Sequence, residues 1–395
     1  MRAFVAAICL GTAAFVGSGS TYAEVPPAVM KDCLEGKLPS CLGILKKRWV
    51  ELQQWQFEQV ASKACDLGHT SSCGELLKNM EVRYRRFWKA KQGNPVERPA
   101  IDLVKYLRVL NQFQGYSEIP SEAHPPESVR DLVDRAYAQL DPAVHLLLGD
   151  ALVGIYLMEN LGSSAIAVDV WDDRQKVVGG VIALDIGWLN RAANEWATTK
   201  ENTAFQKEKS YQLKVKLAEA GKNTREAALQ YILLHEIGHI IEQTRRLNPP
   251  GDRAPRWVKT HRYPYFKLSW MGGHEKYVSR FDRNFPERAR LSFYSPKANP
   301  PAAKPTLAEA TAIYRKLEQT SFPTLYAATH PQDDFAEAFA NYVHVVLMKR
   351  PYQVTLTKDG KITRELKDCW NARRCREKRK FLEKLFQVLQ APTKK

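Results

Sequence analysis

The residues best suited to chemistry in this chain form the motif His235-Glu236-Ile237-Gly238-His239. On a helix, histidines four positions apart lie on one face, where both imidazoles can bind the same metal ion. The glutamate beside them can accept a proton from a water molecule on that metal. The motif therefore predicts one Zn²⁺ ion with His235 and His239 as ligands and Glu236 as general base, which is the chemistry of a hydrolase.

The segment around this motif favours a helix from about Asn223 to about Arg246. Asn223 and Glu226 resemble a capping box, and helix-forming alanines and leucines follow them. Few polar positions remain before the end of the segment, so we expect a mostly buried helix with basic residues near its C-terminus. The alternative to a metal site is a structural histidine in the core beside a surface carboxylate.

A catalytic zinc ion needs a third protein ligand and leaves a fourth position for water. Glu242 and Arg245 occupy the positions where a metzincin carries glycine and histidine, so that arrangement is excluded. A second helix-like segment contains Asp333 and Glu337, four positions apart on one face. One of them can bind the metal while the other accepts the second N–H of a ligating histidine. Alternatively, these acidic residues only complement the helix dipole.

The segment from Tyr326 to Phe339 reads Tyr-Ala-Ala-Thr-His-Pro-Gln-Asp-Asp-Phe-Ala-Glu-Ala-Phe. It resembles the end of the catalytic domain of anthrax lethal factor and related gluzincin-type metallopeptidases. In that family the H-E-x-x-H helix is followed by a tyrosine, by a zinc-binding glutamate seven residues later, and by Phe-Ala-Glu-Ala-Phe. The resemblance implies these roles: His235 and His239 as ligands, Glu236 as general base, Asp333 as third ligand, Tyr326 as a hydrogen-bond donor to the transition state, and Glu337 as the residue that orients a ligand.

Asp333 departs from the family pattern, which has glutamate at this position. Aspartate is one methylene shorter and must bring its backbone closer to the metal, but it is an accepted zinc ligand. We therefore predict Asp333 as the third ligand, with Glu337 as the alternative ligand. For Tyr326 the alternative is an ordinary half-buried tyrosine that follows a turn at Pro323.

Together these residues predict a zinc metallopeptidase that acts on a protein or peptide substrate. Zinc lowers the pKa of its bound water towards ~7, Glu236 takes the proton, and Tyr326 donates a hydrogen bond to the oxyanion that forms on the attacked carbonyl. The alternative function is a binding protein, in which the zincin-like domain is catalytically idle and N-terminal repeats recognise an envelope partner.

Two β-rich runs precede the motif helix, residues 165–171 and 177–185, and a polar stretch between them predicts a hairpin. Zincins place a sheet before the motif helix, and its edge strand holds an extended substrate by strand pairing. Alternatively, these strands only cover the core. Nearer the C-terminus, residues 354–357 and 361–363 flank Asp359-Gly360 and predict a second hairpin, and residues 367–389 have the pattern of a basic amphipathic helix.

The N-terminus has the pattern of a secretory signal peptide over residues 1–23. Arg2 gives it a basic start, an apolar stretch follows, and Ala23 ends a run of small residues. The apolar stretch is too short to span a bilayer, and no later run is long enough for a membrane span. We expect an exported bacterial protein, periplasmic or secreted.

Six cysteines remain after the signal peptide, and four of them form two pairs with the same spacing. The pairs lie 32 residues apart and their surroundings match, which indicates an internal helical repeat. The pattern resembles the cysteine-rich, tetratricopeptide-related repeats of secreted bacterial proteins. The alternative is zinc-binding pairs, which fits an exported chain poorly. The predicted disulfides are Cys33–Cys41, Cys65–Cys73 and Cys369–Cys375.

The sequence thus predicts an α+β protein in two parts. Residues 24–91 form a disulfide-stapled α-helical repeat module, residues 92–99 a linker, and residues 100–395 a mainly helical zincin-like metallopeptidase domain with a small sheet. The repeat module is a candidate surface for a protein partner.

The formal net charge of +16 favours acidic substrates or anionic envelope surfaces. The basic residues are scattered and no aromatic patch interleaves with them, so we expect no nucleic-acid partner. Of the other histidines, His330 and His344 flank the ligand helix and are candidates to line the cleft.

Overall fold

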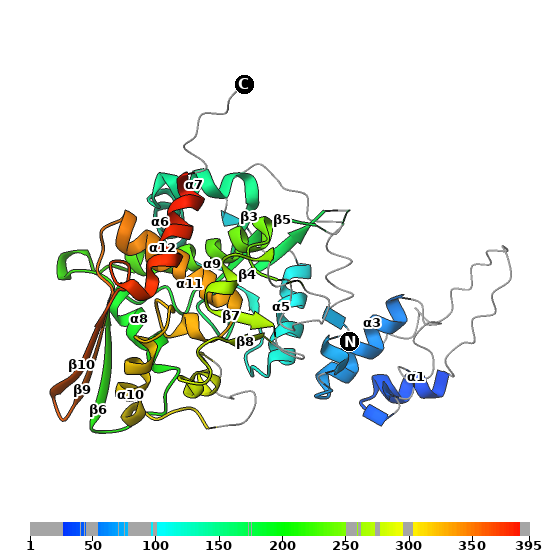
Figure 1. The fold of residues 1–395 in the computed structure, drawn as a ribbon. Helices are drawn as coiled ribbons and strands as arrows, with labels where there is room; N and C mark the ends of the chain where they lie inside the picture. Colours follow the sequence, from blue (N-terminus) through cyan, green and yellow to red (C-terminus); the bar gives the residue numbers. More distant parts are fainter. Residues whose placement is uncertain are drawn as a thin grey trace. The chain divides into compact units, whose positions relative to one another are not determined.

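The structure is a computed structural model that divides into two compact units, Met1–Leu76 and Leu77–Lys395, which are considered separately (Figure 1). The predicted signal peptide and the predicted domain boundaries at residues 91 and 99 lie outside the described residues. The residues that the structure describes are 27–39, 41, 42, 44, 54–69, 71–74, 76, 77, 96, 97, 101–172, 174, 176–249, 259, 262–272, 277–294 and 303–387.

The described residues of the first unit include the helices α1 (Pro27–Leu34) and α3 (Gln54–Asp66). A disulfide starts near the C-terminal end of each helix, at Cys33 and at Cys65. The S–S distance is 2.02 Å both in Cys33–Cys41 and in Cys65–Cys73. Gly36 and Gly68 occupy equivalent turns with φ of 106° and 89°, a backbone conformation that favours glycine. Each repeat is therefore a helix, a glycine turn and a disulfide that joins the helix to a helical residue after the turn.

The second unit is built around a five-stranded sheet. Its strands are β1 (Val96–Glu97), β2 (Ser121–Glu122), β3 (Leu152–Glu159), β4 (Ala165–Trp171) and β5 (Val177–Asp185). The order is β1-β3-β5-β4, with β2 also paired to β3. The β4–β5 hairpin is the one that the sequence predicts, and β4 is an edge strand, antiparallel to β5. β1 lies inside the stretch predicted as a linker and pairs with β3 instead.

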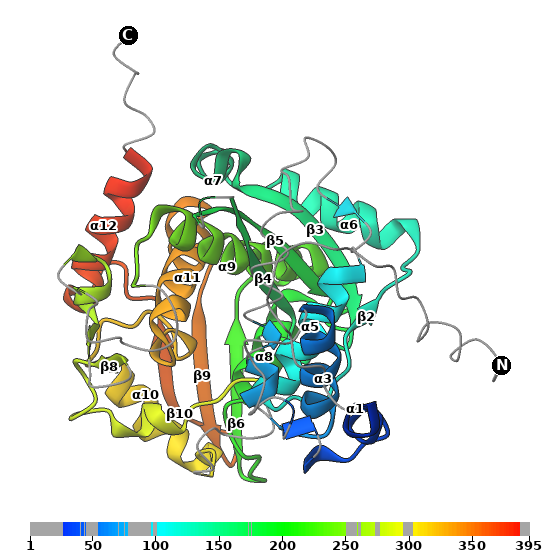
Figure 2. The ribbon, with the colours of Figure 1, turned by 90° about the vertical axis from the view of Figure 1, so that its right-hand side faces the viewer.

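The motif helix is α9 (Arg225–Arg245), which packs against β4 and β5 and lies beside α11 (Pro331–Tyr342) in the middle of the unit (Figure 2). Its N-cap is Thr224, whose hydroxyl accepts a hydrogen bond from Ala227 N; the predicted cap, Asn223, instead accepts one from Asn194 N. Thr224 caps because it is the residue with extended backbone directly before the first helical turn.

Two further sheets are present besides the five-stranded one, where the sequence predicts one small sheet and a separate hairpin, so the fold is a mixture of helices and sheets. β6 (Tyr211–Lys216), β9 (Gln353–Lys358) and β10 (Lys361–Lys367) form a three-stranded antiparallel sheet. The β9–β10 turn at Asp359 and Gly360 has positive φ at both positions, as the predicted hairpin requires. β7 (Trp270–Gly272) and β8 (Tyr277–Ser279) form a small ribbon.

The other long helices surround these sheets. They are α5 (Ile101–Gln114), α6 (Glu127–Ala138), α7 (Pro142–Leu148), α8 (Ala193–Asn202), α10 (Leu307–Leu317) and α12 (Arg376–Gln387). A π-helical turn, Val343–Leu347, continues α11, and short 3₁₀ turns cover Gly149–Ala151, Ala220–Lys222, Phe266–Leu268, Pro286–Arg290, Tyr326–Ala328 and Arg373–Cys375.

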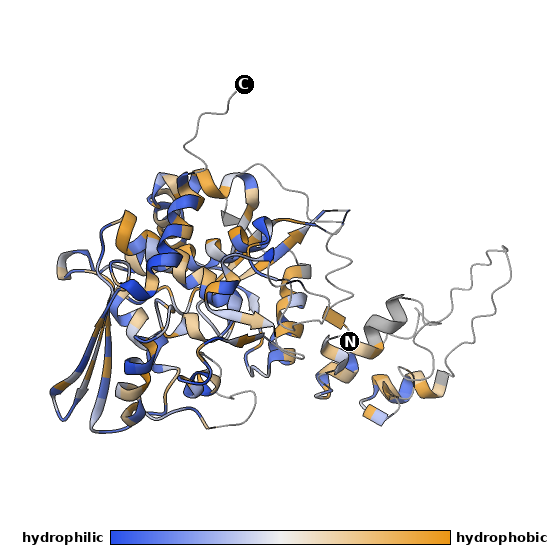
Figure 3. Cartoon of the chain, viewed as in Figure 1, coloured by the Kyte–Doolittle hydropathy of each residue, from blue (hydrophilic) through white to orange (hydrophobic). Residues whose placement is uncertain are grey.

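The predicted basic C-terminal helix is wrong at its start. Lys367 ends strand β10, the Cys369–Cys375 disulfide closes the next loop, and α12 begins only at Arg376. Apolar and polar residues alternate along the helices (Figure 3), and no helix of the described part is long and apolar enough to cross a membrane.

Candidate metal centre

α9 and α11 bring three potential metal ligands together. His235 Nε2 and His239 Nε2 lie 3.1 Å apart. Asp333 Oδ1 lies 3.7 Å from His239 Nε2 and 4.0 Å from His235 Nε2. In a tetrahedral centre with bonds of 2.0–2.1 Å, ligand atoms are separated by roughly 3.3 Å. The group formed by His235, His239 and Asp333 could therefore hold a metal ion.

Glu337 lies behind His235 and not among the three converging ligand atoms. Its Oε1 is 3.2 Å from His235 Nδ1, a buried nitrogen with no well-aligned hydrogen-bond partner. A carboxylate at this position favours the tautomer that leaves Nε2 free for a metal. The structure thus places the two acidic residues differently: Asp333 lies beside the two Nε2 atoms, and Glu337 lies at the other nitrogen of one imidazole.

Three further residues hold the Glu337 carboxylate, which is 1% exposed. Lys200 Nζ donates to Oε1 at 2.5 Å, and the hydroxyls of Thr324 and Tyr231 donate to Oε2 at 2.8 and 3.3 Å. Burial alone would raise the pKa of Glu337, but Lys200 and His235 outweigh it and hold the pKa well below its ordinary value. Glu337 is therefore a carboxylate, able to accept a hydrogen bond from His235.

Glu236, the predicted base, belongs to the motif helix α9, and its side chain lies next to the edge strand β4. Burial raises its pKa to about 7, against the opposing effect of His235 and of a hydrogen bond from the Ala167 backbone. A carboxyl group that titrates near neutrality is suited to accept and return a proton. This shift is consistent with the role that the sequence predicts.

The ligand residues also have shifted pKa values. Burial lowers the pKa of His239 well below its ordinary value and raises that of Asp333. At His235, burial alone would lower the pKa, but Glu337 and Glu236 raise it above its ordinary value. A metal ion would bind the neutral imidazole, so protonation of His235 would oppose binding.

The ligand group opens into a pocket of about 690 Å³ whose lining includes residues 163–169, so the edge strand β4 forms one wall. The ring of Tyr326 lines the pocket and lies nearly parallel to that of His235, with centroids 5.3 Å apart. His330 lines the pocket too, whereas His344 is buried elsewhere, with Nε2 2.9 Å from the Leu217 carbonyl oxygen. The pocket's other aromatic residues are Tyr106, Tyr116, Trp171, Trp196 and Tyr294.

Sequence reasoning missed Lys200, Tyr294 and the other aromatic residues of the pocket, because they come from distant segments without a motif. One weak signal was available for Lys200. In α8 it lies four positions after Trp196, on the same face as that buried ring, where a charged side chain needs a partner.

Comparisons with family models, with curated proteins and with solved structures find no match for this chain. The function is therefore argued from the geometry of the site itself.

Proposed function

We propose that this protein is an exported, zinc-dependent metallopeptidase of the zincin type, with the fold and the roles that the resemblance to gluzincins implies. One observation carries the proposal: two Nε2 atoms and a carboxylate oxygen converge within 4.0 Å, beside a glutamate, in a pocket bounded by an edge strand. The set of two imidazoles and one carboxylate fits zinc, and the placement of Glu337 at His235 Nδ1 fits a ligand that uses Nε2.

When bound, zinc supplies Lewis acidity, which makes a water molecule easier to deprotonate and polarises a substrate carbonyl. Glu236 accepts the proton from that water and returns it to the amine leaving group. Tyr326 lines the pocket beside His235 and donates a hydrogen bond to the oxyanion. Asp333 is held by Thr329, whose hydroxyl donates to Oδ2 at 3.1 Å, so that Oδ1 faces the imidazoles.

Strand β4 supports a peptide as the substrate. It is an edge strand, pairs with β5 on one side, and contributes Ala165 to Asp169 to the wall of the pocket. An extended peptide can therefore add to the sheet through main-chain hydrogen bonds, while its side chains contact the pocket. The three disulfides are compatible with an oxidising compartment outside the cytoplasm, which agrees with export.

The test compares wild-type protein with Glu236→Gln on unfolded protein, peptides and peptidoglycan fragments, with zinc content measured in parallel. Loss of the base should reduce kcat by about 10²–10⁴-fold and leave bound zinc at one ion per chain. Glu226→Gln, the same change on the same helix but away from the pocket, should leave activity unchanged. Full activity of Glu236→Gln would refute the assignment of the base.

The wild-type protein could instead bind zinc and hydrolyse none of these substrates. That result would favour the alternative function, a binding protein with a catalytically idle zincin-like domain.

A further inference from the structure

Lys200 lies where several parts of the candidate site meet. It comes from α8, and its side chain is 8% exposed, an unusual position for an ammonium group. Nζ is 2.5 Å from Glu337 Oε1 and 4.4 Å from the centroid of the Tyr326 ring. The Trp196 ring, with its centroid 5.6 Å away, also borders it. One cation therefore contacts both the carboxylate behind His235 and the predicted transition-state donor.

The contact with Glu337 has a defined geometry. Oε1 of Glu337 lies 2.5 Å from Lys200 Nζ and 3.2 Å from His235 Nδ1. Oε2 accepts hydrogen bonds from the hydroxyls of Thr324 and Tyr231. Since burying a charge without a partner is costly, the ammonium and the carboxylate hold each other in place. Among the residues that the structure describes, no other lysine or arginine forms an ion pair with this carboxylate.

Besides Glu337, the ammonium of Lys200 contacts the ring of Tyr326. An ammonium close to the face of an aromatic ring is attracted by the ring's negative face, and the attraction is stronger when water is excluded. The same tyrosine ring lies nearly parallel to the imidazole of His235. Lys200 and His235 therefore both contact that ring, together with Phe293 and Tyr294, whose ring centroids lie 4.7 and 6.5 Å from its own.

We propose that Lys200 is a positioning residue of the metal centre, which holds Glu337 against His235 and holds the Tyr326 ring in the pocket. Its action on Tyr326 rests on the proposed peptidase function, but its action on Glu337 concerns metal binding alone. A residue that orients a metal ligand through a second residue typically changes metal affinity by about 10–100-fold.

The first experiment measures zinc affinity by competition with a chromogenic chelator. Lys200→Met should weaken zinc binding by about 10–100-fold, and Lys200→Arg, which keeps the charge, should recover most of the loss. Glu195→Gln is the control, because Glu195 belongs to the same helix, α8, and is exposed to solvent. Its zinc affinity should equal that of the wild type. Wild-type affinity in Lys200→Met would overturn the proposal.

A double-mutant cycle keeps the proposal testable if Lys200→Met unfolds. The variant Lys200→Met/Glu337→Gln removes both charges and leaves no unpaired buried ion. If Lys200 acts through Glu337, this double variant should bind zinc as weakly as Glu337→Gln alone, and no weaker. A double variant that binds zinc more weakly than Glu337→Gln alone would show that Lys200 acts independently of Glu337 and would overturn the proposal.

The readouts separate this inference from the proposed function. A wild-type protein that binds zinc but hydrolyses no peptide would refute the peptidase, while the affinity pattern of the Lys200 variants would still test its role at Glu337. If the protein is a peptidase, Lys200→Met saturated with zinc should also lose kcat with little change in KM, because Tyr326 acts in the transition state.

Discussion

Asp333 reaches the two imidazoles although its side chain is one methylene shorter than the glutamate of the resembling family. The close approach of α11 to α9 accounts for this, because a Cβ placed on Gly238 would lie only 2.8 Å from Ala336 Cα. The backbone of α11 is therefore near enough for the shorter carboxylate to lie 3.7 Å from His239 Nε2.

At the same scale, Tyr326 offers a clean test of the oxyanion donor. Within the described part of the chain its hydroxyl makes no hydrogen bond, so Tyr326→Phe should change the free energy of unfolding by less than about 0.5 kcal/mol. Removing the donor should lower kcat by about 10²–10³-fold with little effect on zinc content. Steady-state kinetics on the zinc-loaded variant would check this, and an unchanged kcat would assign Tyr326 to packing alone.

His344 gives a prediction of pH dependence away from the metal ligands. Burial lowers its pKa from the ordinary 6.5 to about 4, partly offset by the carbonyls of Leu217 and Pro351. Between pH 6.5 and 4 the unfolded chain binds a proton here that the folded chain does not, so this residue destabilises the fold as pH falls through that window. Replacing it with Gln should flatten the acid side of the stability curve.

The size of this effect is up to about 3 kcal/mol between pH 7 and pH 4, since one pKa unit corresponds to about 1.4 kcal/mol. Denaturant unfolding of both proteins across this range, in the presence of a chelator, would measure it. Curves that stay parallel at every pH would contradict the buried, neutral state of His344.

At the scale of elements, α9 fits between the sheet and α11 because both contacts involve a glycine. Gly238 faces Ala336 of α11, and Gly180 of β5 faces Ile240 of α9, where a Cβ would lie 2.7 Å from Ile240 Cγ1. Packing thus constrains Gly238, one of the two variable positions of the H-E-x-x-H motif. The distance between the helices sets the distance from Asp333 to the two histidines.

Gly238→Ala should therefore disturb both stability and the metal site. The added methyl group meets backbone atoms that cannot move alone, so we expect a loss of about 1–3 kcal/mol in the free energy of unfolding, together with weaker zinc binding. Gly221→Ala is the control, because no heavy atom lies within 4 Å of its new methyl group. Chelator competition and denaturant unfolding give both quantities. Zinc affinity unaffected by Gly238→Ala would mean that the helix contact does not set the ligand geometry.

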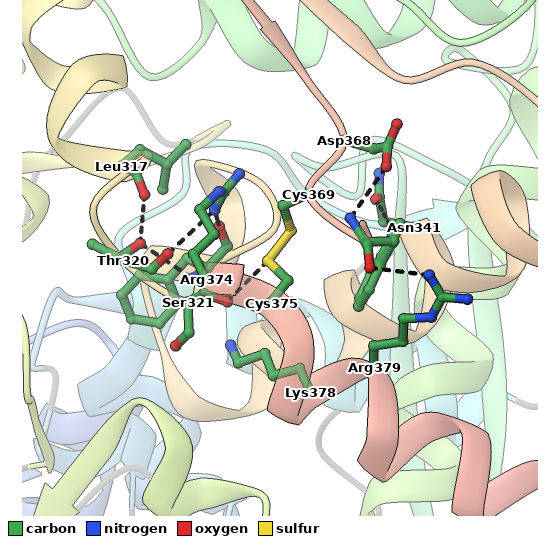
Figure 4. Close-up of a disulfide and its surroundings, with 12 residues drawn as sticks. Leu317, Thr320, Ser321, Asn341, Asp368, Cys369, Arg374, Cys375, Lys378 and Arg379 are labelled. Atoms are coloured by element: carbon green, nitrogen blue, oxygen red, sulfur yellow. Dashed lines mark hydrogen bonds between the residues drawn. A yellow bond between two sulfur atoms is a disulfide. The ribbon is translucent and has the colours of Figure 1, made fainter. Parts of the chain in front are cut away.

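The C-terminal loop and α12 clamp the segment that leads to the site (Figure 4). Arg374 donates to the carbonyl oxygens of Thr320 and Phe322 at 3.3 and 2.6 Å, just before Thr324 and Tyr326. Lys378, which is 1% exposed, forms an ion pair with Asp334, the neighbour of the third ligand. The C-terminal residues thus support two parts of the site from outside the pocket.

At the scale of the whole molecule, this arrangement predicts different roles for the disulfides. Cys369–Cys375 closes the loop that carries Arg374 and precedes α12. Replacing both cysteines with serine should lower the free energy of unfolding by about 2 kcal/mol, the entropy expected for so short a loop, and should weaken zinc binding. Cys33→Ser/Cys41→Ser, in the other compact unit, is the matched control and should leave zinc affinity unchanged.

Thermal unfolding and zinc competition on the purified variants would test this difference. Equal zinc affinity in both pairs of variants would show that the C-terminal loop does not support the site.

Features of the chain that depend on local spacing could be predicted from the sequence. The motif helix, the β4–β5 hairpin, the turn at Asp359-Gly360 and the three cysteine pairs each depend on residues close in the chain, whose periodicity or turn chemistry is sufficient evidence. Strands β3 and β6 were missed, and their pairing partners, β5 and β9, come from other parts of the chain.

The sequence by itself determined which side chains can bind a metal and accept a proton, because helical spacing alone puts His235 and His239 on one face with Glu236 beside them. The tertiary structure alone decided which acidic residue meets them and which supports them. Asp333 and Glu337 share a helix face, and only the packing of α11 against α9 and the contact from Lys200 of α8 distinguish their positions. That packing also brings Lys200 to Glu337 across 137 residues of sequence, a contact to which no local pattern corresponds.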